Sequence, residues 1–451
     1  MSIAIFFQCA VIVHPQYMDV FNINLTGALL RGDKDCMKVV QRRPPKTRRH
    51  HDADPDSRLG TAVTAGTPRS VGIGVIGYDG VARAHLQAIL RLASVFWPPP
   101  ARPVLAALSG RSADRVQEAA QRYGAPAVYT DWRRLIEDRR VELLINCGPN
   151  DLHADPCLAA AARGLHMLCE KPLARSSAEA AKMRDAAVRA GTVHMTGYNY
   201  RFVPAVLLAR EMIVEGRLGQ IRHFRARYCD DSMIDPDVPY TWRHNRAEAG
   251  SGVIGDLAAH AIDLARFLVG EISAVSAAAR IFVDRRPRPQ GGDGTVDVED
   301  AIEAVVEFAG GAVGTLEASS MCPGRKNFLT FEVNGTLGTL IFNLERLNEL
   351  EVCLQGDAVG GFRTVLVTER HHPYGGRWWP PGHLLGWEQT FVHQLHRLLT
   401  AVAGQGQAGP EGATFEDGYQ CAVVCDLLDR AAHEGRRVAA AGVAPSRASG
   451  E

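Results

Sequence analysis

The chain has 451 residues, of which 46% are hydrophobic and 22% are charged, so it is long enough for two globular domains of ordinary size. Its 50 Lys and Arg residues balance its 50 Asp and Glu residues, and this zero net charge argues against nucleic acid or a membrane surface as a partner. The ten cysteines form no C-x-x-C pair, which favours reduced thiols in a cytoplasmic protein over a disulfide framework or a zinc site.

The first 69 residues differ from the rest of the chain. The opening run MSIAIFFQCAVIVH has no preceding Lys or Arg and no small-residue cleavage site close behind it, so it does not resemble a signal peptide. It is also too short to cross a bilayer. The stretch RRPPKTRRHHDADPDSRLGTAVTAGTPRS that ends this region is polar and Pro-rich, without helical or strand periodicity. We expect residues 1–69 to be a disordered lead, or to lie upstream of the natural start.

Strands and helices alternate from residue 70 onward. Short apolar runs are each followed by a segment with apolar residues at helical spacing. Such an alternation predicts an α/β domain with a doubly wound parallel sheet of the Rossmann type, and a ligand at the carboxyl ends of its strands. The predicted strands are 70–77, 102–110, 141–148 and 165–172, and the predicted helices are 80–96, 112–124 and 151–164.

The first strand leads into a glycine turn, VIGYDGVARAH. An earlier match to G-x-G-x-x-G begins inside the strand, where glycines cannot form a phosphate-binding turn. The frame that fits begins at the strand end and comprises Gly77, Tyr78, Asp79, Gly80, Val81 and Ala82. Asp79 stands where the pyrophosphate of a dinucleotide comes closest and a glycine is usual. We expect its carboxylate to turn away, so that backbone N–H groups of the helix hold the phosphates.

The end of the second strand bears on the choice between the two NAD(P) cofactors. An NAD enzyme usually has Asp or Glu there, to accept a hydrogen bond from the adenosine ribose. This chain has Ser109, Gly110 and Arg111 instead. Because a guanidinium binds a phosphate through two hydrogen bonds, these residues favour NADP(H). The alternative is that Arg111 is a surface charge at the start of the next helix.

Three motifs further along the chain carry a family resemblance. They are CEKPLA at 169–174, GYNYRFVPA at 197–205 and AGSGVIGDLAAHAIDLARFLVGE at 249–271. Together they resemble the Gfo/Idh/MocA family of nicotinamide-dependent sugar and polyol dehydrogenases, and the resemblance extends over residues 70–435. Within this family the chain looks closest to members that act on anhydrosugars, inositols and other cyclic sugars.

The resemblance implies a domain plan. An N-terminal Rossmann domain would be followed by a C-terminal α+β domain with an open, mainly antiparallel sheet. One face of such a sheet needs a cover, so we expect a homodimer or homotetramer formed through it. The implied parts are an NAD(P)-binding domain at 70–194, a substrate-binding and oligomerisation domain at 195–386, and helices at 387–440 that pack back on the Rossmann domain.

The chemistry of such an enzyme indicates which residues would be catalytic. Oxidation of a sugar alcohol releases the hydroxyl proton as hydride moves to the nicotinamide, so a base must lie beside the cofactor. The resemblance makes His260 that base and Lys171 the charge that stabilises the alkoxide. Asp256, one helical turn before His260, would orient the base or hold a sugar hydroxyl. The alternative is structural, with Lys171 paired to Glu170 or Asp256 and His260 in a capping or core role.

Other binding residues carry over from the resemblance. The segment CGPNDLH has Gly148 where the family usually has threonine, which leaves its match incomplete. The implied cofactor-binding residues are Pro149, Asn150, His153 and Glu170. The implied substrate-binding residues are Arg201, Trp242 and Arg243, each of which could instead belong to the domain interface.

The segment 371–399 is rich in His and Trp. Its tryptophans could stack on a sugar, and His371, His372 and His383 suggest a metal. No Cys or carboxylate partner has ligand spacing there, and the chemistry needs no metal, so we expect none. A rival interpretation of the whole chain also stays open: with Asp79 in the phosphate turn, the protein could be a non-catalytic relative that binds a sugar or a protein partner.

Overall fold

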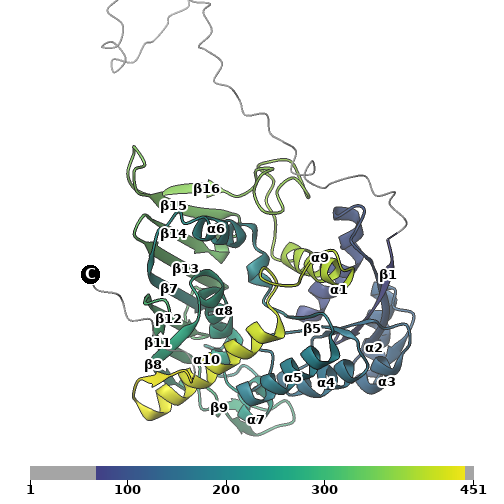
Figure 1. Ribbon diagram of the computed structural model, residues 1–451. Helices are drawn as coiled ribbons and strands as arrows, with labels where there is room; N and C mark the ends of the chain where they lie inside the picture. Colours follow the sequence, from purple (N-terminus) through teal and green to yellow (C-terminus); the bar gives the residue numbers. More distant parts are fainter. Residues whose placement is uncertain (1–67, 442–451) are drawn as a thin grey trace, which may run out of the picture. The chain divides into compact units, whose positions relative to one another are not determined.

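The structure is a computed structural model that describes residues 68–441 (Figure 1). The predicted lead therefore lies outside the described residues, except for its last two. The N-terminal half contains a six-stranded parallel sheet in the order β3-β2-β1-β4-β5-β6. Its elements are β1 (Ser70–Ile76), α1 (Val81–Val95), β2 (Arg102–Ser109), α2 (Ala113–Tyr123), β3 (Val128–Tyr129), α3 (Trp132–Glu137), β4 (Leu143–Asn146), α4 (Ala154–Ala162), β5 (His166–Cys169), α5 (Ser177–Ala190) and β6 (His194–Thr196).

Local sequence signals account for these elements. Val71, Ile73 and Val75 of β1 are fully buried, as expected of a parallel strand that has helices on both faces. Helix α2 begins after Ser112, whose hydroxyl accepts from a backbone N–H of the first turn, and it ends at Gly124 in a left-handed conformation. The strand order reverses at β1, between β2 and β4. Such a reversal leaves a crevice at the carboxyl ends of the strands.

The C-terminal half is built on a nine-stranded sheet in the order β16-β15-β14-β13-β7-β12-β11-β8-β17. All its neighbouring pairs are antiparallel except β12 and β7. The strands are β7 (Ile221–Cys229), β8 (Ile272–Arg280), β11 (Ala301–Phe308), β12 (Val313–Ser319), β13 (Phe328–Gly335), β14 (Gly338–Asn343), β15 (Glu349–Leu354), β16 (Arg363–Leu366) and β17 (Val438–Ala439), beside a separate hairpin of β9 (Arg285–Pro287) and β10 (Asp293–Thr295). The predicted fold class, a Rossmann domain joined to an α+β domain, is confirmed.

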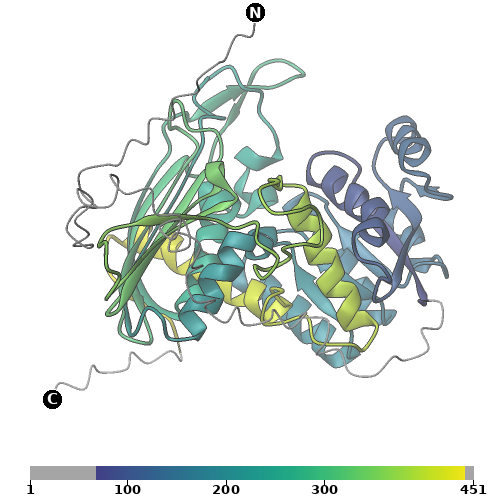
Figure 2. The same cartoon turned by 90° about the horizontal axis from the view of Figure 1, so that it is seen from above.

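Helices cover only one face of this sheet. The core between them includes Phe224, Phe331 and Phe342 from the strands and Leu207 and Ile262 from the helices, and Figure 2 shows the helices gathered on one side. Side chains along each strand point alternately to this core and to the opposite face of the sheet, which is more exposed. We call this second face the open face. The covering helices are α6 (Pro204–Val214), α8 (Ala259–Leu268) and α10 (Phe415–Glu434).

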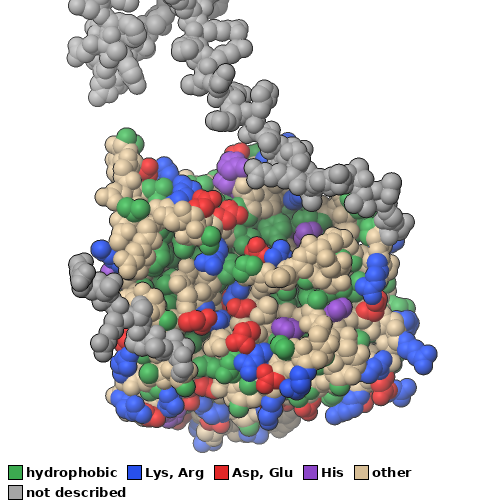
Figure 3. Space-filling model, viewed as in Figure 1, with side chains coloured by type: hydrophobic (Ala, Val, Ile, Leu, Met, Phe, Trp, Pro, Cys, Tyr) green, Lys and Arg blue, Asp and Glu red, His purple; other side chains and the backbone are tan. Residues whose placement is uncertain are grey.

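Helices α9 (Gln389–Val402) and α10 connect the two halves. Helix α9 packs against α1 of the Rossmann half, and α10 contacts both α5 and β8. The short α7 (Arg246–Ala249) and a π-helix (Ile254–Ala258) precede α8. Positive and negative side chains are interspersed over the face drawn in Figure 3, in keeping with the zero net charge. No helix within 68–441 is long and apolar enough to cross a bilayer.

Candidate active site

A cavity of about 420 Å³ lies at the crevice predicted by the strand order. The start of α1 and the loops after β4 and β5 form one side, and residues of the C-terminal half form the other. Most of the predicted site residues line it: Asp79, Gly80, Val81, Pro149, Asn150, His153, Glu170, Lys171, Trp242, Arg243, Asp256 and His260. Trp387, one of the tryptophans predicted to stack on a sugar, also lines it, and so does Gly148. The sequence analysis assigned no site role to the other lining residues, Cys147, Asn199, Tyr200, Tyr228 and Phe391.

The three predicted catalytic residues meet at this cavity. Lys171 Nζ donates to Asp256 Oδ1 and to the backbone oxygen of Asp256, each at 2.7 Å. A second cation, Arg243, lies 3.3 Å from the same Oδ1. The Asp256 side chain is nevertheless 43% exposed, because its other edge faces the cavity. The predicted structural pair of Lys171 and Asp256 is therefore present, and it lies within the site itself.

The backbone that carries Asp256 and His260 differs from the predicted regular helix. Residues Ile254–Ala258 form a π-helix, and α8 begins at Ala259. Both side chains still face the same cavity, as predicted for residues four positions apart. A π-turn is often found at functional sites. The prediction that the two residues share a face is thus supported, and only the regular α-helix predicted over 254–258 is replaced by a π-helix.

The charge state of this group follows from its surroundings. Burial lowers the pKa of His260 well below its ordinary value, the charge of Lys171 lowers it further, and Asp256 only partly opposes them. Burial would raise the pKa of Asp256, but Lys171 and Arg243 outweigh it and lower that pKa. At neutral pH the site thus contains a neutral imidazole beside an ionised carboxylate. The His260 Nδ1 atom is buried without a hydrogen-bond partner.

Aromatic residues surround the imidazole of His260. The ring centroids of Tyr198, Tyr200 and Tyr228 lie 5.8, 4.5 and 5.9 Å from that of His260. The hydroxyls of Tyr200 and Tyr228 are 3.0 Å apart, and that of Tyr228 donates to Asn327 Oδ1 at 2.6 Å. The motif GYNYRFVPA contains two of these tyrosines, but Tyr228 and Asn327 had no local signal in the sequence.

Glu170 is held by the Rossmann half. Its carboxylate contacts His85 Nε2 at 2.7 Å, and both side chains are buried. It also accepts from the N–H of Lys171 at 3.2 Å. Gly197 leaves the space that the carboxylate occupies, since a Cβ there would lie 2.7 Å from it. Glu170 therefore reaches the cavity in one fixed position.

Two other predicted cofactor residues are tied to the backbone. His153 bridges the carbonyl oxygens of Gly148 and Pro172, at 2.9 and 2.8 Å, and Asn150 Nδ2 donates to the oxygen of Ala249 at 2.8 Å. Both line the cavity, yet these bonds join the loops after β4 and β5 to the C-terminal half. These hydrogen bonds thus hold the two side chains and their loops in position.

The phosphate turn fits a dinucleotide. Gly77 and Gly80 have φ angles of 101° and 53°, which favour glycine, and a Cβ at Gly80 would meet open space. Beyond it, Val81 begins α1 at the cavity wall, where the first N–H groups of a helix lack partners within the helix. Ala82 is buried as a packing residue. These residues can hold a pyrophosphate.

Asp79 forms an ion pair that the sequence did not predict. Its carboxylate contacts the guanidinium of Arg115, from the first turn of α2. The Arg115 guanidinium also lies over the ring of Tyr78, 5.3 Å from its centroid, and that ring leaves no room for a Cβ at Gly110. The negative charge of Asp79 in the phosphate turn is thus offset by a neighbouring cation.

Besides Gly77, Tyr78 and Ala82 of the glycine turn, three predicted residues do not line the cavity. Ser109 is buried at the end of β2, where its backbone oxygen accepts from the N–H of Gly77 at 2.8 Å. Arg111 follows it and is exposed. The prediction for Arg201 is corrected more strongly. Its buried guanidinium bonds to Asp263 at 2.6–3.1 Å and to Asp417 at 3.1 Å. A charge removed from water needs such partners, so Arg201 joins helices and does not contact the substrate cavity.

Family comparisons agree with this architecture. Residues 71–198 match the family model described as oxidoreductase family, NAD-binding Rossmann fold. Residues 206–341 match the GFO/IDH/MocA C-terminal domain. The first match covers nearly all of the six-stranded sheet, and the second covers β7 to β13 and most of β14 of the C-terminal half.

Individual proteins are similar over most of the chain. Levoglucosan dehydrogenase of Pseudarthrobacter phenanthrenivorans is 40% identical, with 81% of this chain and 97% of the relative covered. A solved structure of levoglucosan dehydrogenase with NADH and levoglucosan matches with a TM-score of 0.79, over 82% of this chain and 99% of that one. Myo-inositol 2-dehydrogenase of Thermotoga maritima is 27% identical over 55% of this chain and 68% of its own. The chain therefore belongs to the Gfo/Idh/MocA family of NAD-binding oxidoreductases.

Proposed function

We propose that the protein is an NAD(P)-dependent dehydrogenase that oxidises a secondary alcohol of a cyclic sugar. An anhydrosugar such as levoglucosan is the first candidate substrate, because the 40% identical relative bears that name, and inositols come next. The observation that carries the proposal is the group of Lys171, Asp256 and neutral His260 on one cavity wall.

Each residue of this group has a role in the proposed reaction. A bound nicotinamide supplies the acceptor for hydride. His260, being neutral, can take the hydroxyl proton as the carbon–hydrogen bond breaks. Lys171 places a positive charge at the oxygen on which negative charge develops. Asp256 holds the Lys171 ammonium through two 2.7 Å contacts and keeps the local charge balanced.

The remaining walls suit a sugar. Trp242, Trp387 and Tyr200 line the cavity, and aromatic rings pack well against the C–H faces of a pyranose. The hydroxyls of Tyr200 and Tyr228 can exchange hydrogen bonds with those of a substrate. We therefore place the sugar between the Lys171 group and these rings. Trp242 and Arg243 keep their predicted role in substrate binding.

For the cofactor we propose that NADP is accepted, and favoured over NAD. The end of β2 has no carboxylate to bind a ribose hydroxyl, and both Arg111 and Arg115 lie close by in the chain. Arg115 is the stronger candidate, since it contacts the turn residues Tyr78 and Asp79. The same ion pair weakens the case for a non-catalytic relative, which rested on the presence of Asp79 in the phosphate turn.

For assembly we propose a homodimer or homotetramer formed through the open face of the nine-stranded sheet. Val305 and Val313 on that face are 54% and 45% exposed, and large exposed apolar residues on a sheet favour a cover. All eight cysteines that the structure describes are free thiols, consistent with the proposed cytoplasmic location.

An activity screen tests the proposal. Purified protein is supplied with NAD⁺ or NADP⁺ and with levoglucosan, myo-inositol or D-glucose, and the reduced cofactor is followed by absorbance. We expect turnover with at least one cyclic sugar and none in a Lys171→Met variant. Cofactor binding, measured by fluorescence, should persist in that variant. Tight cofactor binding without turnover on any sugar would contradict the dehydrogenase and favour the non-catalytic relative.

A further inference from the structure

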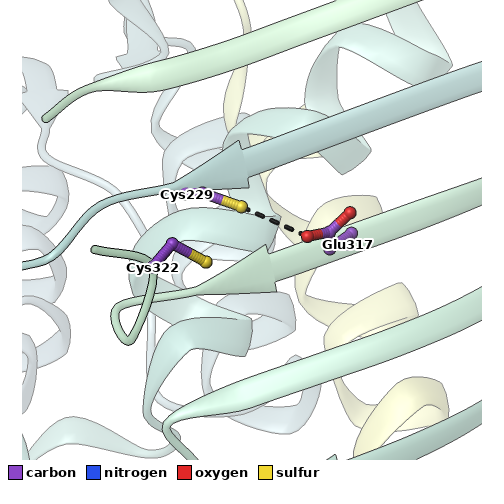
Figure 4. A group of neighbouring side chains, drawn as sticks. All are labelled: Cys229, Glu317 and Cys322. Atoms are coloured by element: carbon purple, nitrogen blue, oxygen red, sulfur yellow. Dashed lines mark hydrogen bonds between the residues drawn. The ribbon is translucent and has the colours of Figure 1, made fainter. Parts of the chain in front are cut away.

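A second group of reactive side chains lies apart from the catalytic cavity. Cys229 at the end of β7, Glu317 on β12 and Cys322 in the loop after β12 bring two thiol sulfurs and a carboxylate oxygen within 4.8 Å of one another. Figure 4 shows the three side chains near the ends of two neighbouring strands, with the Cys229 sulfur directed toward the Glu317 carboxylate. The Sγ of Cys229 already donates to Glu317 Oε1 at 3.4 Å. None of these residues lines the catalytic cavity.

Sheet register brings the group together. Strands β7 and β12 are parallel neighbours, and Cys229 pairs with Ser319. Glu317 lies two residues before Ser319, so its side chain is on the same face of the sheet as that of Cys229. Cys322 follows three residues after β12, where its N–H donates to the oxygen of Asp230 at 2.9 Å. Cys229 is buried, and the other two are partly buried. The backbone hydrogen bonds of β7, β12 and the loop after β12 therefore fix the positions of the three residues.

We propose that Cys229, Glu317 and Cys322 bind a soft divalent cation of the Zn²⁺ class, with water as a fourth ligand. Two thiolates with a carboxylate are ligands that such ions accept, and thiolate selects against Mg²⁺ and Ca²⁺. Tetrahedral bonds of about 2.3 Å place two sulfurs about 3.8 Å apart. The present separations need to contract by no more than about 1 Å, which the short loop that carries Cys322 can supply.

The charge around the group suits such an ion. Two thiolates, one carboxylate and a divalent cation leave one net negative charge. The Nε of Arg227 lies 3.8 Å from Glu317 Oε2, the oxygen that does not contact Cys229. This guanidinium balances the remaining charge and orients the carboxylate, as outer partners of metal ligands commonly do. Binding would release the two thiol protons.

The cation would have a structural role. It would join the end of β7 to the loop between β12 and β13. Tyr228 precedes Cys229 and faces the catalytic cavity, and its hydroxyl bonds to Asn327 at the end of the same loop. Loading the site should therefore raise the melting temperature and stiffen one wall of the cavity, without supplying any catalytic group.

Cadmium titration of the reduced, metal-free full chain tests the proposal. We expect one Cd²⁺ per chain to produce the ultraviolet charge-transfer band of thiolate ligands, and Zn²⁺ to displace it. Cys322→Ser, in the loop, should weaken binding by at least about tenfold, as should Cys229→Ser, while Glu317→Gln should weaken it less. Cys353→Ser, a partly buried cysteine elsewhere in the sheet, is the matched control and should bind normally.

Two results would overturn the proposal. One is a missing charge-transfer band, or a band that survives in Cys322→Ser, provided that circular dichroism shows that variant to be folded. The other is a Cys229–Cys322 disulfide in air-exposed protein, found by mass spectrometry, together with no Cd²⁺ binding after reduction. That result would make the two cysteines a redox pair. Because no sugar or nicotinamide enters the experiment, its outcome is independent of the proposed dehydrogenase.

Discussion

At the scale of single residues, the contacts of the site serve both stability and chemistry. Lys171 is only 18% exposed and would be costly to bury alone, yet its partner Asp256 sits on the cavity wall. The same ammonium lowers the pKa of His260, after burial has already lowered it. An ion pair that could have been assigned a purely structural role therefore also keeps the proposed base neutral.

Substitution of the two central residues tests the mechanism. Lys171→Met and His260→Asn remove the charge and the base with little change in size. We expect each to lower kcat by about 10²–10⁴, with cofactor binding within a few-fold of the parent. Because both act on the same oxygen, the double variant should lose less than the product of the single losses. Steady-state kinetics and fluorescence titration measure these effects, and near-normal turnover in either single variant would refute the assignment.

The pair of Asp79 and Arg115 makes a prediction about cofactor choice. Asp79→Gly should free the guanidinium of Arg115 and tighten NADPH by up to about fivefold, the size of an exposed ion pair of about 1 kcal/mol. NADH should change less. Arg115→Ala should weaken NADPH more than NADH, and Arg111→Ala serves as the comparison. Equal effects of Arg115→Ala on the two dissociation constants would show that Arg115 does not contact the ribose phosphate.

At the scale of elements, helix α9 is anchored by a buried histidine. His393 accepts from the indole N–H of Trp378 at 2.7 Å and contacts the oxygen of Phe202 at 3.0 Å through Nδ1. The ring of Tyr374 stacks on it with centroids 3.8 Å apart. Helix α9 packs against α1, and the His393 ring lies 6.3 Å, centroid to centroid, from that of Phe96 directly after α1, so this histidine helps to join the His- and Trp-rich segment to the Rossmann half. His393 of that segment thus has a packing role.

Acid should weaken this anchor. Burial lowers the pKa of His393 from 6.5 to about 3, so below pH 6.5 the unfolded chain binds a proton that the folded chain does not. Stability should therefore fall as pH decreases from 6.5, by up to about 1.4 kcal/mol per pH unit for one such group. Urea unfolding between pH 7 and 4.5 measures the slope. His393→Gln should reduce it, whereas His371→Gln, at an exposed position, should leave it unchanged.

At the scale of the whole molecule, the two sheets differ in how many of their faces are covered. The six-stranded sheet has its core residues on both faces, in two separate clusters. The nine-stranded sheet buries one face under helices and leaves the other open. A cavity of about 270 Å³ on the open face is lined by residues of four neighbouring strands, among them Arg227, Thr330, Ile341 and Glu351.

A charge on the open face should disrupt the proposed oligomer. Val305→Asp, at a position 54% exposed on β11, places a carboxylate where a second copy would pack. Val188→Asp, at a position 63% exposed on α5, is the matched control. Light scattering after size exclusion should show dissociation for the first variant and the parent mass for the second. A monomeric parent protein, or equal masses for both variants, would refute the proposed interface.

Local patterns in the sequence were enough for much of the fold and the site. Strand and helix periodicity predicted the Rossmann sheet, and the family resemblance of the motifs around Lys171 and His260 predicted residues that line one cavity. These inferences succeed because buried strands, helix caps and residues a few positions apart are governed by neighbours in the chain. Even so, the π-helix before α8 changed the geometry between Asp256 and His260, since propensity does not distinguish it from an ordinary turn.

Pairings between distant residues were decided only by the tertiary structure. Arg115 lies 36 residues from Asp79, Asp417 lies 216 from Arg201, and Glu317 lies 88 from Cys229. No local pattern connects such residues, because strand register and helix docking bring them together. Those arrangements minimise exposed apolar surface and unpaired buried charge over the whole chain. The sequence by itself thus predicted most of the residues that line the cavity, and packing decided which charges are neutralised and where thiols meet.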